Sequence, residues 1–187
     1  MRKAFLFDLG GALVGYYMKD QFLKILVHAI LEVGDYLQEV GLLGEPPTNL
    51  WDSVRMEDHD SLDHSVRPLE GRLARIFRLD ESSLSESVLI TVCDRFLQSI
   101  FHAGRLYDDT IRVLSELRER SYGTTVVSNT PWGSPAELWR RELAAIGLTK
   151  HLGATVFCRE SDTGNQLDRS SSTHWRSLEY SPRTASS

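Results

Sequence analysis

The chain has 187 residues, of which 41% are hydrophobic and 25% charged, as in an ordinary globular protein. Its formal net charge of −5 gives no electrostatic reason to expect nucleic acid or an anionic membrane as a partner. Because no apolar run approaches membrane-spanning length and none at the start has the pattern of a signal peptide, we expect a cytoplasmic protein.

The stretch KAFLFDLGGALV, residues 3–14, begins with a short apolar run that ends at Asp8. This run is too short for a helix and lacks helical spacing, which indicates a buried strand. Burying Asp8 beside it is costly unless the carboxylate meets a cation or several donors, and Gly10 and Gly11 free the backbone to curl around a ligand. Asp8 is then either a turn cap or a carboxylate at the end of a central parallel strand, where α/β sheets bind ligands.

Residues Phe5 to Val14 resemble motif I of the haloacid dehalogenase-like (HAD) hydrolases, a strand followed by D-x-D-x-[TV]-[LV]. The resemblance implies that Asp8 is a nucleophile that accepts a phosphoryl group, with its other oxygen on Mg²⁺. It also implies that the Gly10 carbonyl is a second Mg²⁺ ligand and that Gly11 lies in the phosphate-binding site. Many phosphatases of the family carry an acid/base Asp where this chain has Gly10, so the carbonyl is kept but the proton donor is lost.

Residues 16–105 are predicted to form a helical insert. Apolar residues recur at three and four positions from Phe22 to Val40, which predicts a long amphipathic helix, and Ser83-Leu84-Ser85-Glu86 predicts a capping box that opens another. The polar stretch from Asn49 to Arg67 is predicted to be a solvated loop. Its alternative is a metal site formed by Asp58, His59, Asp60, Asp63 and His64. By resemblance the insert is the family's cap, which closes over the active site and selects the substrate; a plain helical subdomain is the alternative.

From Tyr107 the sequence alternates between helices and strands. The β-branched run Thr124-Thr125-Val126-Val127 predicts a strand, Ser134-Pro135-Ala136-Glu137 a helix start with a serine N-cap, and residues 154–158 a third strand. This order predicts a parallel, Rossmann-like α/β core that is incomplete at its C-terminus. The two cysteines, Cys93 and Cys158, fit no metal spacing and are expected to be buried free thiols.

A hydroxyl at a strand end, such as that of Ser128, suits a phosphate oxygen. A lone serine at a strand end is usually a turn residue. Ser128, however, ends the first predicted strand after the insert, one helix further along the chain, and this position favours a functional role. The stretch VVSNTPWGSP resembles motif II of the HAD family. The resemblance implies that Ser128 holds a phosphate oxygen and that Asn129 positions the substrate.

After Glu160 the family pattern would continue with a motif III lysine and with the acidic Mg²⁺ ligands of motif IV, and the sequence contains neither. Lys150 is expected to be a surface residue instead. Residues 161–187 include eleven Ser or Thr and are expected to form a disordered tail unrelated to the family. Codons can be chosen for residues 161–175 whose shifted frame reads GYRKP, similar to motif III. We therefore hypothesise that the tail is a frameshifted or mis-spliced reading of a longer hydrolase.

The expected organisation is an α/β core of residues 1–15 and 106–160, a helical cap of residues 16–105 and the tail. The implied function is Mg²⁺-dependent hydrolysis of a small phosphomonoester through an aspartyl-phosphate on Asp8, with weak activity in this chain. The alternative is a non-catalytic HAD fragment that lacks the motif III lysine and the motif IV carboxylates. The missing strand would leave one edge of the sheet unpaired, which would invite self-association.

Overall fold

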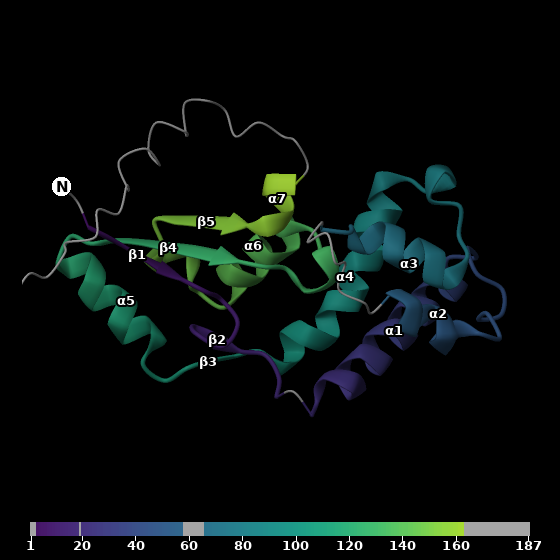
Figure 1. The fold of residues 1–187 in the computed structure, drawn as a ribbon, viewed down its shortest axis with the longest axis horizontal. Coiled ribbons are helices and arrows are strands. Elements are labelled where there is room, and N and C mark those ends of the chain that lie inside the picture. Colours follow the sequence, from purple (N-terminus) through teal and green to yellow (C-terminus); the bar gives the residue numbers. More distant parts are fainter. Residues whose placement is uncertain (1–2, 19, 58–65, 163–187) are drawn as a thin grey trace, which may run out of the picture.

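The computed structural model describes residues 3–18, 20–57 and 66–162. The predicted tail beyond Asp162 and the Asp and His cluster of residues 58–64 therefore lie outside the described residues. In the described part, an α/β core and a helical unit lie side by side (Figure 1). None of the described helices has the length and apolar character needed to cross a membrane.

The core is built on a parallel sheet with the strand order β1–β4–β5, formed by Ala4–Phe7, Gly123–Ser128 and Ala154–Phe157. Helix α5 (Thr110–Glu119) precedes β4, and α6 (Ala136–Ala145) connects β4 to β5. Short 3₁₀ turns follow β4 and α6, at Pro131–Gly133 and Thr149–His151 (η2 and η3), and α7 (Cys158–Asp162) follows β5. The predicted Rossmann-like α/β core is confirmed, and the three strands end at the same edge of the sheet.

A two-stranded antiparallel ribbon joins this core to the helical unit. It pairs β2 (Val14–Gly15) with β3 (Arg105–Leu106). Between them in the sequence lie the helices α1 (Phe22–Glu39), α2 (Leu50–Glu57), α3 (Leu69–Phe77) and α4 (Glu86–Ala103), with a 3₁₀ turn, η1, at Glu81–Ser83. These helices occupy the stretch that the sequence predicts as an insert, and its role as a cap stays a prediction.

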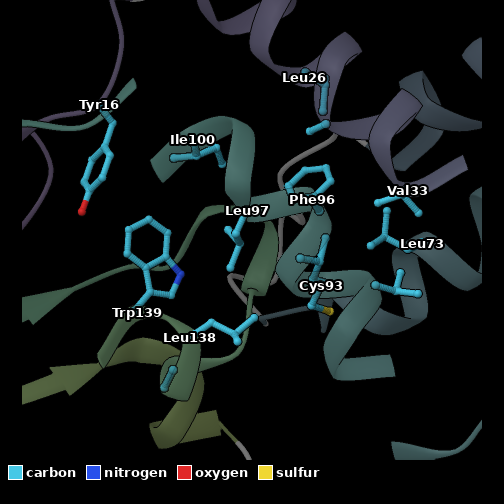
Figure 2. Packing of buried hydrophobic residues seen from close by; sticks show 14 of the residues in the cluster. Tyr16, Leu26, Val33, Leu73, Cys93, Phe96, Leu97, Ile100, Leu138 and Trp139 are labelled. Carbon is cyan, nitrogen blue, oxygen red and sulfur yellow. The ribbon is translucent and has the colours of Figure 1, made fainter. Parts of the chain in front are cut away.

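The helical unit and the core share one continuous buried cluster of apolar side chains (Figure 2). Helix α1 contributes residues at helical spacing that are completely buried: Ala29, Ile30, Val33 and Leu37. Helix α4 continues the cluster towards the core through Phe96, Leu97 and Ile100, and α6 completes it with Leu138 and Trp139. Ile100 and Trp139 therefore lie at the junction of the two parts.

The predicted solvated loop from Asn49 to Arg67 is wrong for its first half, which forms α2. Leu50 and Val54 are four residues apart and both are buried, because α2 packs against α3. Trp51 and Asp52, which lie between them, are exposed. Two apolar residues at helical spacing are too few to distinguish a short helix from a loop in the sequence.

The predicted capping box is also wrong. Helix α4 begins at Glu86, and its N-cap is Ser85, whose hydroxyl accepts a hydrogen bond from the Val88 N–H at 3.4 Å. Ser83 instead donates to the Asp80 carbonyl in the preceding 3₁₀ turn. Because Val88 stands where a capping box needs Glu or Gln, the reciprocal hydrogen bond cannot form.

The first strand is less buried than its composition predicts. Phe5 and Leu6 are 43% and 56% exposed, and only Phe7 of β1 packs against the core cluster. Within the described sheet β1 is an edge strand that pairs with β4 alone. The apolar run therefore correctly predicts a strand but not its environment.

Candidate active site

Asp8 and Ser128 meet at the ends of two neighbouring strands. Asp8 follows β1 directly and Ser128 ends β4. The Ser128 hydroxyl donates a hydrogen bond to Asp8 Oδ1 at 2.7 Å, and the Leu9 backbone N–H donates to the same oxygen at 2.7 Å. These two donors orient the carboxylate, while Asp8 Oδ2 accepts no hydrogen bond from a described residue.

The prediction that Asp8 is buried is wrong. Its side chain is exposed, whereas that of the adjacent Leu9 is buried in the core. The carboxylate at the strand end keeps access to solvent, so two hydrogen bonds suffice to hold it and no burial cost has to be offset.

A tight turn follows Asp8 and exposes one backbone acceptor. Gly11 has a φ of +79°, which favours glycine, and its N–H donates to the Val14 carbonyl at 2.9 Å. Within the described part of the chain, the Gly10 carbonyl accepts no hydrogen bond and is available to a ligand. The Gly11 N–H is occupied in this conformation, so what Gly11 gives the site is the turn and the absence of a side chain.

The site opens into a cavity of about 670 Å³. All five residues that the sequence predicts for the site line it: Asp8, Gly10, Gly11, Ser128 and Asn129. Asn129 is exposed beside Ser128, consistent with access to a ligand. Lys150 does not line the cavity, because it is exposed on η3, in agreement with its prediction as a surface residue.

Three aromatic residues that the sequence analysis did not assign to the site, Tyr16, Tyr17 and Trp139, also line the cavity. Tyr16 is only 8% exposed and packs edge-to-face on Trp139, with ring centroids 5.4 Å apart. The Tyr16 hydroxyl has no hydrogen-bond partner among the described residues, and burial, with a smaller contribution from Glu142, raises the pKa of Tyr16 above its usual range. Tyr17 is half-buried and packs on Phe22 at 5.6 Å.

The predicted serine cap of α6 has another role. The helix begins at Ala136 after Pro135, and no side chain caps its first turn. The Ser134 hydroxyl accepts a hydrogen bond from the Trp139 indole at 2.8 Å instead. This contact fixes the Trp139 ring. Ser134, which the sequence predicts as a helix cap, therefore supports the cavity wall instead.

Two ion pairs connect the insert to the core. Arg159 of α7 forms a bidentate pair with Glu70 of α3, with both N–O distances at 2.8 Å and side chains only 17% and 15% exposed. Arg141 of α6 pairs with Asp94 of α4.

The two cysteines differ in their environment. Cys158, which precedes Arg159 in the sequence, is half-buried and lines the cavity, which corrects its prediction as a buried thiol. Cys93 is buried as predicted.

The described residues contain no group of three or more His, Cys, Asp or Glu that could hold a metal ion. The donors that the site offers to a cation are the Asp8 carboxylate and the Gly10 carbonyl. Mg²⁺ often keeps several waters and binds through one or two carboxylates together with substrate phosphates. This pair of oxygen donors therefore fits a Mg²⁺ ion whose other ligands are water and phosphate.

No protein-family model and no curated protein matches the sequence. Among solved structures, the chain is similar to a HAD phosphatase from Thermococcus onnurineus, with 20% identity, a TM-score of 0.47 and coverage of 86% of this chain and 63% of that one. It is also similar to a putative HAD-hydrolase from Bacillus subtilis bound to magnesium, with 15% identity, a TM-score of 0.42 and coverage of 87% and 65%.

A third similar structure is a predicted phosphoglycolate phosphatase from Haemophilus somnus, with 20% identity, a TM-score of 0.40 and coverage of 83% of this chain and 62% of that one. This chain thus spans less than two thirds of the length of each of the three. Two of them are described as HAD proteins, the family whose motifs the sequence resembles. At these identities the likeness concerns the path of the chain, so function has to be argued from the residues of the site.

Proposed function

We propose that this chain is a HAD-like hydrolase that acts as a phosphatase on a small phosphomonoester and uses Asp8 as the nucleophile. The contact between Asp8 and Ser128 carries this proposal. It places a nucleophilic carboxylate and a hydroxyl suited to a phosphate oxygen 2.7 Å apart, at the wall of a cavity large enough for a substrate. Aspartate side chains are established nucleophiles in phosphoryl transfer.

The reaction proceeds in two displacements. An Asp8 oxygen attacks phosphorus, the bond from phosphorus to the leaving oxygen breaks, and an aspartyl-phosphate forms as the alcohol departs. Water then attacks phosphorus, which releases inorganic phosphate and restores the carboxylate. When substrate binds, the Ser128 hydroxyl rotates from Asp8 Oδ1 to a phosphate oxygen, and the exposed Asn129 helps to position the substrate.

The Asp8 carboxylate and the Gly10 carbonyl are the groups that would hold Mg²⁺. Such an ion, when bound, neutralises charge on the phosphate. Gly10 has no side chain to protonate the leaving group, and general acid catalysis typically contributes about 10²–10⁴-fold. Water or a residue of the predicted cap then has to supply the proton, and substrates with good leaving groups react fastest.

Hydrolysis of 4-nitrophenyl phosphate tests the proposal, because nitrophenolate departs without a proton. We expect slow turnover that requires Mg²⁺ and disappears in Asp8→Asn, which keeps the shape of the side chain but removes the nucleophile. Asp108→Asn is the matched control, since Asp108 is exposed and does not line the cavity. Turnover that survives Asp8→Asn would mean that another residue is the nucleophile. Binding of phosphate analogues without any turnover would favour the non-catalytic alternative.

A further inference from the structure

Phosphate-binding groups form only part of the cavity wall, and most of the other lining residues are aromatic or aliphatic. We propose that the leaving group of the substrate is a neutral group bearing an aromatic ring, bound in a recess formed by Tyr16, Tyr17, Ile100, Pro131 and Trp139. We call these five residues the aromatic recess. The inference rests on the proposed function, because it names the substrate class of the same site.

The size of the cavity indicates a leaving group of substantial volume. Pockets for drug-sized ligands measure about 300–1,000 Å³, and this cavity of about 670 Å³ lies within that range. A phosphoryl group held by Asp8 and Ser128 fills only the part next to these two residues. The remainder is large enough for a ring.

The charge of the described lining residues disfavours an anionic leaving group. None of the described residues that line the cavity is Lys, Arg or His, and Asp8 is the acidic side chain among them. A carboxylate or a second phosphate on the leaving group would lose water without gaining a cationic partner, which is costly. It would also lie in the same cavity as the Asp8 carboxylate and the transferred phosphate.

The recess offers few polar atoms to a sugar-like leaving group. The Tyr16 hydroxyl is shielded from solvent, so the part of Tyr16 that lines the cavity is its ring. The Trp139 N–H is already bound to Ser134. Ile100 and Pro131 offer only carbon, and Tyr17 adds a single hydroxyl, so a polyol would leave most of its hydroxyl groups unpaired in the recess.

The rings of the recess are held in place before any ligand binds. Trp139 packs edge-to-face on Tyr16 at 5.4 Å and on Phe101 at 5.1 Å, and Ser134 fixes its indole. Figure 2 shows the Tyr16 ring, the Trp139 ring and the Ile100 side chain where the helical unit meets the core. Because aromatic rings favour edge-to-face and offset packing, a preformed wall of this kind binds a further ring with little reorganisation.

Three phosphonates, which cannot be hydrolysed, separate this inference from catalysis. Isothermal titration of the full chain in Mg²⁺ would compare benzylphosphonate, methylphosphonate and phosphonoacetate. We expect benzylphosphonate to bind about tenfold or more tightly than methylphosphonate, because its ring is buried in the recess. Phosphonoacetate, which carries a carboxylate in place of the ring, should bind no more tightly than methylphosphonate.

Variants at Tyr17 and Val127 test the recess itself. Tyr17→Ala should reduce the benzyl preference several-fold and Tyr17→Phe should keep it, while Trp51→Ala, which removes an exposed ring outside the cavity, should leave it unchanged. Val127 lines the cavity and is 42% exposed, so it can be replaced by a long side chain. Val127→Arg should raise the affinity for phosphonoacetate relative to methylphosphonate.

The possible failures are distinguishable. Equal binding of benzylphosphonate and methylphosphonate, or tighter binding of phosphonoacetate to the unchanged chain, would overturn the inference and leave the phosphate site standing. A benzyl preference without turnover of any phosphate ester would support the recess and refute catalysis. Absence of binding by all three compounds would overturn the phosphate site and the inference together.

Discussion

The helical insert and the first strand of the sheet differ in how fully they bury their apolar residues. In α1 the residues Ile30, Val33 and Leu37 are completely buried, whereas Phe5 and Leu6 of β1 are about half exposed. Helix α1 packs along α4, but β1 has a described strand on one side only. Apolar packing thus concentrates in the insert, while β1 mainly serves to present Asp8 beside Ser128.

This division allows chemistry and stability to be changed separately. Asp8 is exposed and makes two hydrogen bonds at the cavity, so its replacement affects few packing contacts. The insert contributes Ile100 to the cavity wall and is joined to the core by the pair of Glu70 with Arg159. The following predictions test this difference, beginning with the largest effect.

A matched pair of leucines gives the strongest contrast. Leu37→Ala removes a completely buried side chain of α1 and should lower the free energy of unfolding by about 2.7–5 kcal/mol. Leu6→Ala removes a side chain that is 56% exposed and should change it by about 0.5 kcal/mol or less. Urea denaturation of both variants measures this difference. Similar losses would mean that β1 is covered in solution.

The next effect concerns the ion pair between insert and core. Glu70→Gln should lower the free energy of unfolding by about 1.5–3 kcal/mol, because it weakens two charge-assisted hydrogen bonds from the largely buried Arg159. Glu116→Gln is the control, since its partners Arg112 and Arg120 lie on the surface of α5 and at its C-cap, and exposed pairs contribute about 0.2–1 kcal/mol. Equal losses in urea denaturation would show that Arg159 and Glu70 do not join the two parts.

A smaller effect depends on pH. The hydrogen bond from Arg75, opposed by partial burial, lowers the pKa of Glu57 below its ordinary value. A lowered pKa stabilises the folded chain above the pKa of the unfolded state, and this contribution is lost as pH falls through the folded value. Arg75 is more than half exposed, so solvent screening limits the pair to about 0.2–1 kcal/mol.

The difference in unfolding free energy between the unchanged chain and Glu57→Gln should therefore narrow between pH 7 and pH 3. Urea denaturation across this range measures it. A difference that stayed constant or widened in acid would contradict the assigned pair.

The weakest expected effect is self-association through the edge of β1. Strands with an unpaired edge and exposed apolar residues favour pairing with another copy, and a lysine on the edge opposes it. Sedimentation velocity should show concentration-dependent dimers that Leu6→Lys reduces. A chain that stays monomeric at every concentration would refute this prediction.

The elements that sequence predicts well are those specified by neighbouring residues. Asp8 and Ser128 each follow an apolar run that forms a strand, and the alternation of strands and helices places both at one edge of a parallel sheet. The aromatic recess could not be predicted, because Tyr16, Ile100 and Trp139 come from distant parts of the chain. Only Tyr16 and Tyr17 are neighbours in the sequence, and the sequence analysis assigned neither of them to the site.

Other expectations failed where a tertiary contact replaced a local one. Ser134 has the sequence context of a helix cap, but its hydroxyl binds the Trp139 indole. Arg159 and Glu70 are 89 residues apart, so no local pattern relates them. The apolar composition of β1 indicates burial only if other elements cover the strand, and the described residues leave Phe5 and Leu6 open to solvent.

The central claim is that Asp8 becomes phosphorylated during turnover, and its most direct test is to trap that intermediate. The chain would be mixed with 4-nitrophenyl phosphate and Mg²⁺, quenched in acid, digested and analysed by mass spectrometry. We predict a hydroxylamine-sensitive phosphoryl group on the peptide that contains Asp8, present in Asp108→Asn and absent in Asp8→Asn. Turnover with the phosphoryl group on another residue, or with no phosphorylated residue at all, would contradict the account.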